Sequence, residues 1–125
     1  MDIIIDYRET QLYKLVTEKL NDDNISVKTD NLTIGDIVIN DRVTNKTLFI
    51  IERKTVSDLV SSISDGRYKE QCFRLSETDH VKHNIIYLVE GNITQHNFNF
   101  TRIKRDTLYS VMCSLQFLKG FSLFK

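Results

Sequence analysis

Two hydrophobic patterns alternate along this chain. Short runs of β-branched and other apolar residues are typical of buried strands, and apolar residues that recur every three or four positions are typical of helices. The strands are expected at residues 2–6, 24–30, 32–40, 47–54, 84–91 and 121–124, and the helices at residues 9–20, 55–63, 67–75 and 105–118. Strands that alternate with helices predict an α/β fold, with a mixed central sheet flanked by helices.

A polar stretch, "NDRVTNK", separates the third and fourth expected strands and predicts a β-hairpin that turns near Thr44. Folding the hairpin about this point brings Asp36 back beside Glu52 or Lys54. The pattern therefore predicts that acidic and basic side chains meet at one end of the sheet.

The composition fits one compact domain over residues 1–125. The chain is 41% hydrophobic and 27% charged, and it contains no proline and no Gly/Ser-rich tract that would suggest a linker. No apolar run approaches the roughly 18 residues of a membrane span, and the start "MDIIIDYRE" is acidic where a signal peptide is basic. We therefore expect an intracellular protein, nuclear or cytoplasmic, that is neither secreted nor bound to a membrane. The formal net charge is zero, so any binding of nucleic acid must be local.

The stretch "LFIIERKTVSD" ends an apolar strand in three consecutive charges. Because side chains alternate between the faces of a strand, Glu52 and Lys54 point to one side and Arg53 to the other. Asp36 on the paired strand adds a second carboxylate. Two neighbouring carboxylates repel each other unless a cation lies between them, and such oxygen ligands suit Mg²⁺ or Mn²⁺. An ordinary surface pair of Glu52 and Lys54 is the alternative.

Further acids lie near the ends of the same elements. Asp6 ends the first expected strand, and Glu9 follows at the start of a helix, where the helix dipole alone favours an acid. Asp58 lies four residues after Lys54 and is also compatible with a simple helix cap.

The motifs "GDIVI" and "IERKTVSD" resemble the Gly-Asp and Glu-Arg-Lys-x-x-x-Asp signature of the XPF-type structure-selective endonucleases. "SSISDGRYKEQCFRL" is similar to the segment that follows in the crossover-junction endonuclease branch. "DYRE" matches the first acidic motif of the family, and "YLVEG" matches the strand after the Asp-Gly-Arg helix. The resemblance covers essentially the whole chain in the right order.

This resemblance implies a restriction-endonuclease-like nuclease core that cuts one strand of branched DNA with Mg²⁺ or Mn²⁺, in repair or recombination. The substrates would be 3′ flaps, forks or nicked junctions, and the enzyme would be a homodimer or a heterodimer with a related subunit. The implied metal ligands and catalytic lysine are Asp36, Glu52 and Lys54. Asp6 and Glu9 would be supporting acids around the metal, with Arg8 in the same motif, and Asp58 would be the closing acid of the second motif. Arg53 would contribute through a salt bridge, a phosphate contact or its main-chain carbonyl.

Arg67 at the "DGRY" turn has two interpretations that the sequence does not separate. Together with Arg74, two turns later, it could bind phosphates, or it could tie the turn to Asp58 or Asp65. Gln71 and Arg74 are expected to face DNA or a dimer partner.

Three functions stay open at the level of the sequence. The first is the active endonuclease, the second is a phosphodiesterase of the same fold that acts on RNA or small nucleotides, and the third is a catalytically silent partner subunit. Family members usually carry a helix-hairpin-helix module, for which there is no room after Lys125. Either the native chain continues or this protein reaches DNA by another route.

Overall fold

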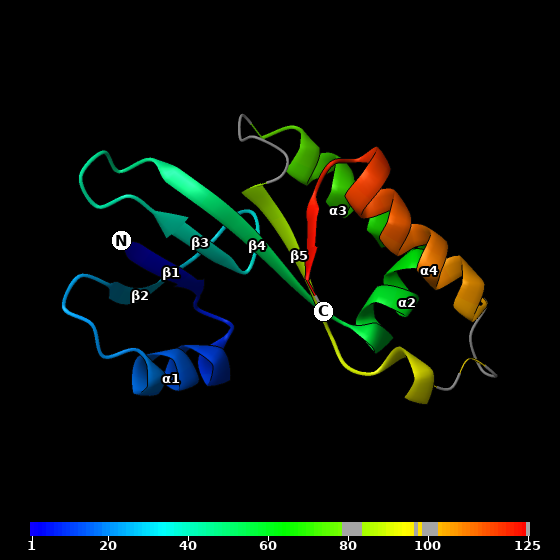
Figure 1. The fold of residues 1–125 in the computed structure, drawn as a ribbon, viewed down its shortest axis with the longest axis horizontal. Coiled ribbons are helices and arrows are strands. Elements are labelled where there is room, and N and C mark those ends of the chain that lie inside the picture. The colour runs from blue at the N-terminus through cyan, green and yellow to red at the C-terminus, as the bar shows by residue number, and fades with distance from the viewer. Residues whose placement is uncertain (79–83, 97, 99–102, 125) are drawn as a thin grey trace. The chain divides into compact units, whose positions relative to one another are not determined.

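The computed structural model describes residues 1–78, 84–96, 98 and 103–124 (Figure 1). It divides into two compact units, Met1–Glu52 (unit 1) and Arg53–Lys125 (unit 2). The boundary falls within strand β4 (Thr47–Thr55), so this strand contributes residues to both units. No helix in the described part of the chain is long and apolar enough to cross a membrane.

Unit 1 contains a mixed sheet and one helix. Its elements are β1 (Asp2–Asp6), α1 (Thr10–Lys19), β2 (Ser26–Asp30), β3 (Ile37–Asn40) and the first part of β4. The strand order is β2-β1-β3-β4. β1 is parallel to β2 and antiparallel to β3, and β3 is antiparallel to β4. The prediction of a mixed sheet is confirmed.

The predicted hairpin is formed by β3 and β4. The Asp41 amide donates to the Lys46 carbonyl at 2.8 Å, and Asn45 adopts a left-handed conformation with φ of 57°. The pairing of the two strands shifts register between Ile39 and Asn40. The hairpin is confirmed, but β3 begins at Ile37 and not at residue 32, because the chain turns at Gly35 (φ 74°) before it enters the strand.

Unit 2 packs its helices against a short sheet. Its elements are α2 (Val56–Asp65), α3 (Arg67–Ser76), β5 (Ile85–Glu90), a 3₁₀ turn η2 (Ile93–Gln95), α4 (Arg105–Cys113), a π-helical turn η4 (Ser114–Leu118) and β6 (Ser122–Phe124). The order is β4-β5-β6, with β5 and β6 parallel. Figure 1 shows α2, α3 and α4 on one side of β5.

Buried and half-buried residues alternate along β5, and the buried ones belong to the core of unit 2. Ile85, Tyr87 and Val89 are buried, and the residues between them are half-buried. The Tyr87 ring stacks on Phe121 with 5.9 Å between centroids. This core fixes the end of β5, from which the loop towards η2 begins.

The helices differ in how far their apolar spacing corresponds to burial. α2 buries Leu59 and Val60 almost completely. α1 has no buried side chain, and Leu15 is 51% exposed although it shares a helical face with Leu12. The spacing therefore predicted the helix but not a buried face.

Candidate active site

Main-chain hydrogen bonds connect Asp6, at the end of β1, and Asp36, just before β3, to the middle of β4, where Glu52 lies. The Asp6 amide donates to the Asp36 carbonyl at 2.9 Å, and the Asp36 amide donates to the Ile51 carbonyl at 2.8 Å. Ile51 directly precedes Glu52 in β4 and is paired with Ile37. The prediction that the hairpin returns Asp36 to the stretch of the second strand that contains Glu52 is confirmed, although β4 continues beyond Glu52 to Thr55.

Gly35 makes this approach of β3 to β4 possible. A Cβ atom at this position would lie 2.6 Å from the Ile50 Cγ2 atom and 3.3 Å from the Ile51 carbonyl oxygen. Its φ of 74° is also one that L side chains rarely adopt. The glycine before Asp36 is therefore required by geometry.

Asp6 is the most enclosed acid of the site, with an exposure of only 2%. Its Oδ2 accepts from the Arg8 Nε at 2.7 Å, and its Oδ1 accepts from the Leu32 amide at 3.1 Å. Burial alone would raise the pKa of Asp6, but these hydrogen bonds outweigh burial and leave the pKa below its ordinary value. Asp6 is thus ionised at neutral pH and joins the start of α1 to the segment after β2.

Glu9 is connected to the same turn through the main chain. Its amide donates to the Asp6 carbonyl at 2.9 Å, one residue before α1 begins, and its side chain is half-buried. The placement agrees with either role expected from the sequence, support of a metal or a favourable position at the start of a helix.

The structure does not gather the four acids that were expected around a metal, Asp6, Glu9, Asp36 and Glu52, into one cluster. Among the described residues, no three His, Cys, Asp or Glu side chains gather closely enough to hold a metal. Mg²⁺ usually keeps several waters and needs only one or two carboxylates. Asp36 and Glu52, both half-buried, are the two carboxylates that the sequence motif offers for such an ion.

Unit 2 begins with the basic residues of the motif. Lys54 is half-buried and lies two residues after Glu52 in β4. Arg53 forms a two-pronged ion pair with Glu90: Nε to Oε1 at 2.6 Å and Nη2 to Oε2 at 3.0 Å. The hydrogen bonds from Arg53 hold the pKa of the Glu90 carboxyl below its usual range. A salt bridge is one of the roles expected for Arg53.

The remaining predicted residues lie on α2 and α3. Asp58 is exposed in the first turn of α2, where its amide donates to the Thr55 Oγ1 at 3.0 Å. Arg67 binds Asp65 through its amide at 3.1 Å and through its Nε at 2.8 Å. Arg67 therefore ties the turn to Asp65, which is one of the two alternatives from the sequence.

Gln71 and Arg74 differ in their surroundings. The Gln71 Oε1 is buried and has no hydrogen-bond partner in the described part of the chain, whereas Arg74 is exposed. Their contact with DNA or with a dimer partner stays a prediction.

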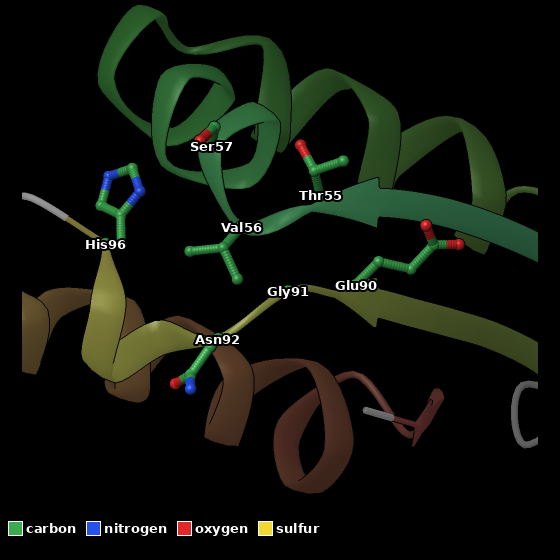
Figure 2. Close-up of a pocket in the computed structure, with 7 residues that line it drawn as sticks. All are labelled: Thr55, Val56, Ser57, Glu90, Gly91, Asn92 and His96. Atoms are coloured by element: carbon green, nitrogen blue, oxygen red, sulfur yellow. The ribbon is translucent and has the colours of Figure 1, made fainter.

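A cavity of about 440 Å³ that was not foreseen from the sequence lies at the start of α2. It is lined by residues 55–57, residues 90–92 and His96 (Figure 2). The sequence analysis also did not identify Glu90 as the partner of Arg53. The one feature of the sequence that pointed to it was its position as an acid at the end of a strongly apolar strand.

Comparisons with known proteins agree with this arrangement. A family model described as the ERCC4 domain matches residues 5–125. The probable crossover junction endonuclease mus81 of Dictyostelium discoideum is 43% identical over 122 residues, which cover 90% of this chain and 13% of that protein.

Two solved structures of XPF from Aeropyrum pernix share the fold at 28% identity. One superposes with a TM-score of 0.70 and the other, a complex with DNA, with 0.69; they match 99% and 98% of this chain and 55% of each solved chain. This chain therefore spans only part of the length of these relatives, and the predicted restriction-endonuclease-like fold is confirmed. The chain belongs to the ERCC4 domain family, in agreement with the XPF-type motifs in its sequence.

Proposed function

We propose that this chain is the nuclease domain of a metal-dependent, structure-selective endonuclease that hydrolyses phosphodiester bonds in branched DNA during repair or recombination. The observation that carries the proposal is that main-chain hydrogen bonds connect Asp6 to Asp36, and Asp36 to Ile51, the residue before Glu52. The crossover junction activity in the name of the Dictyostelium relative and the solved XPF complex with DNA support the choice of substrate.

In this proposal the residues have separate tasks. Asp36 and Glu52 hold a Mg²⁺ or Mn²⁺ ion, which when bound would lower the pKa of a water molecule and offset charge on the phosphate. Lys54 places a positive charge where the phosphoryl oxygens gain negative charge. Asp6 stays ionised through Arg8 and Leu32 and keeps the strand ends in place.

The proposed contacts with DNA are local because the chain has no net charge. Arg74 is exposed, and Arg67 would exchange Asp65 for a phosphate. Contacts of this kind position a duplex without reading its sequence, which suits an enzyme that selects DNA by shape. We further propose that the domain acts together with a second, related subunit.

The test is cleavage of a panel of labelled substrates with Mg²⁺ or Mn²⁺. The panel contains a 3′ flap, a fork, a nicked junction, duplex DNA, single-stranded DNA, RNA and a cyclic dinucleotide. We expect cleavage of the branched DNAs that is lost with Asp36→Asn and strongly lowered, but still measurable, with Lys54→Ala. Asp23→Asn and Lys69→Ala, which change exposed residues of the same types, are the matched controls.

Metal binding gives a second readout that does not depend on catalysis. We expect Asp36→Asn to weaken Mn²⁺ binding, measured by calorimetry, by at least tenfold, and Asp23→Asn to leave it unchanged. Cleavage at the wild-type rate by both Asp36→Asn and Lys54→Ala would reject the assigned site. Preference for RNA or the cyclic dinucleotide would reject branched DNA as the substrate, and a folded protein that binds no Mn²⁺ and cuts nothing would indicate a silent subunit.

A further inference from the structure

The residues at the end of β5 lie against residues 53–56, the segment that follows Glu52, at two places. Glu90, the last residue of β5, forms the two-pronged ion pair with Arg53. The next residue, Gly91, lies against Val56: a Cβ atom on Gly91 would be 3.4 Å from the Val56 Cγ2 atom. The two contacts bracket Lys54 and Thr55, and all of these residues belong to unit 2.

The ion pair is suited to fixing direction as well as distance. Two parallel hydrogen bonds between a guanidinium and a carboxylate define the orientation of both groups. The Arg53 side chain is 24% exposed and that of Glu90 38%, so water covers the pair only in part. Figure 2 shows the Glu90 side chain extending from the end of β5 beside the end of β4.

A third contact fixes the chain directly after Lys54. The Thr55 Oγ1 accepts from the Asp58 amide at 3.0 Å, which sets the point at which β4 ends and α2 begins. The main chain of Lys54 is therefore held on its N-terminal side by Arg53 and on its C-terminal side by Thr55 and Val56.

We propose that Glu90 is a positioning residue for Lys54: through its ion pair with Arg53 it fixes the main chain from which the Lys54 ammonium reaches the reacting phosphate. This inference rests on the proposed function. By strand alternation Arg53 points to the face opposite Glu52 and Lys54, so Glu90 acts from behind the strand and not on the substrate.

The size of the effect follows from the sensitivity of catalysis to position. A displacement of about 1 Å can lower a rate by up to about a hundredfold. The flexible stem of a lysine absorbs part of such a shift. We therefore expect Glu90→Gln to lower kcat by about tenfold and to change KM by less than about twofold.

Glu90→Gln is the appropriate variant because it keeps the size of the side chain but loses the charge and the two-pronged pairing. Arg53→Lys, which keeps the charge but not the planar fork, is expected to lower kcat to the same extent. Glu77→Gln, an exposed glutamate just after α3, is the matched control and should leave kcat unchanged.

A double-mutant cycle separates positioning of Lys54 from a general structural role. In a Lys54→Ala background, Glu90→Gln should cause no further loss, because the group that it positions is gone. A further tenfold loss in that background would overturn the inference, since Glu90 would then act independently of Lys54. An unchanged kcat of Glu90→Gln in the wild-type background would also overturn it.

Amide hydrogen exchange supplies a readout that does not need catalysis. We expect Glu90→Gln to speed exchange at residues 53–56 by at least tenfold, with no change in Glu77→Gln. Unchanged exchange in Glu90→Gln would overturn the inference. If the wild type still cleaves DNA in that case, the proposed function remains intact. Conversely, a wild type that neither binds Mn²⁺ nor cuts any substrate would reject the proposed function itself.

Discussion

The two units hold their strand ends by different means. In unit 1 the ends are aligned by main-chain hydrogen bonds from Asp6 to Asp36 and from Asp36 to Ile51. In unit 2 side chains do this work, through the ion pair of Arg53 with Glu90 and the hydroxyl of Thr55. The geometry of unit 1 therefore depends on main-chain groups, whereas that of unit 2 depends on side chains.

This difference predicts which substitutions change geometry and which change only charge. In unit 1 the geometry should depend on the backbone at Gly35, and the Asp6 side chain should contribute through its hydrogen bonds with Arg8 and Leu32. In unit 2 it should depend on single side chains. Four substitutions test the comparison, from the largest expected effect to the smallest.

Gly35→Ala should be the most damaging change. The new methyl group meets Ile50 at 2.6 Å and the residue keeps a φ of 74°, so we expect a loss of about 3 kcal/mol in the free energy of unfolding. Gly66→Ala in unit 2 is the matched control, because its φ is 85° but no atom lies within 4 Å of the new methyl group. It should cost only about 1 kcal/mol. Equal losses in the free energy of unfolding of the two variants, measured in urea, would show that the left-handed backbone conformation, and not the contact with β4, makes glycine necessary at position 35.

Asp6→Asn should lower the free energy of unfolding by about 2 kcal/mol at neutral pH, because two hydrogen bonds to a buried charge are weakened. The pKa of Asp6 is lowered in the folded state, so its contribution is present above the ordinary pKa of an aspartate, near 4. The contribution is lost as the pH falls through the folded-state value. Urea unfolding of both proteins between pH 7 and pH 3 should therefore show a difference that shrinks below about pH 4. A difference that stays constant would contradict this role.

Thr55→Ala should cost about 1 kcal/mol, because the Asp58 amide loses its capping partner. Thr55→Ser keeps the hydroxyl and serves as the control, which should retain most of the stability. Thermal unfolding followed by circular dichroism measures both. If Thr55→Ala and Thr55→Ser behave alike, the cap does not hold the start of α2.

Leu15→Gln should have the smallest effect, within about 0.5 kcal/mol, because this side chain is half exposed on a helix without buried residues. Leu59→Ala on α2 is the contrasting substitution. Leu59 is completely buried, and its truncation should cost about 3 kcal/mol. A large loss for Leu15→Gln in urea unfolding would show that the apolar face of α1 is covered in solution.

Much of the fold follows from local patterns. The β-branched runs predicted the strands, and the polar stretch around Thr44 predicted the hairpin that aligns Asp36 with the end of β4. Local patterns did not show that β3 starts only after Gly35. They also did not show that the last helix changes into a π-helical turn at Ser114–Leu118.

Apart from the hairpin, the side-chain contacts of the candidate site were predictable only where the two partners are close in sequence. Arg67 and its partner Asp65 are two residues apart, and this pair was among the alternatives. Glu90 is 37 residues from Arg53, and Leu32 is 26 residues from Asp6. Neither partner was foreseen, because periodicity reports the face of an element and not which distant element lies beside it. The metal ion and the catalytic roles stay proposals.

The turn between β3 and β4 offers a place for a spectroscopic label. It lies at the other end of the hairpin from Asp36 and Glu52, and Val43 in this turn is 93% exposed. Cys72 is buried, so Val43→Cys combined with Cys113→Ser would leave one accessible thiol for a fluorophore. A dye attached there would report on DNA binding by anisotropy without touching the acids at the opposite end of the strands.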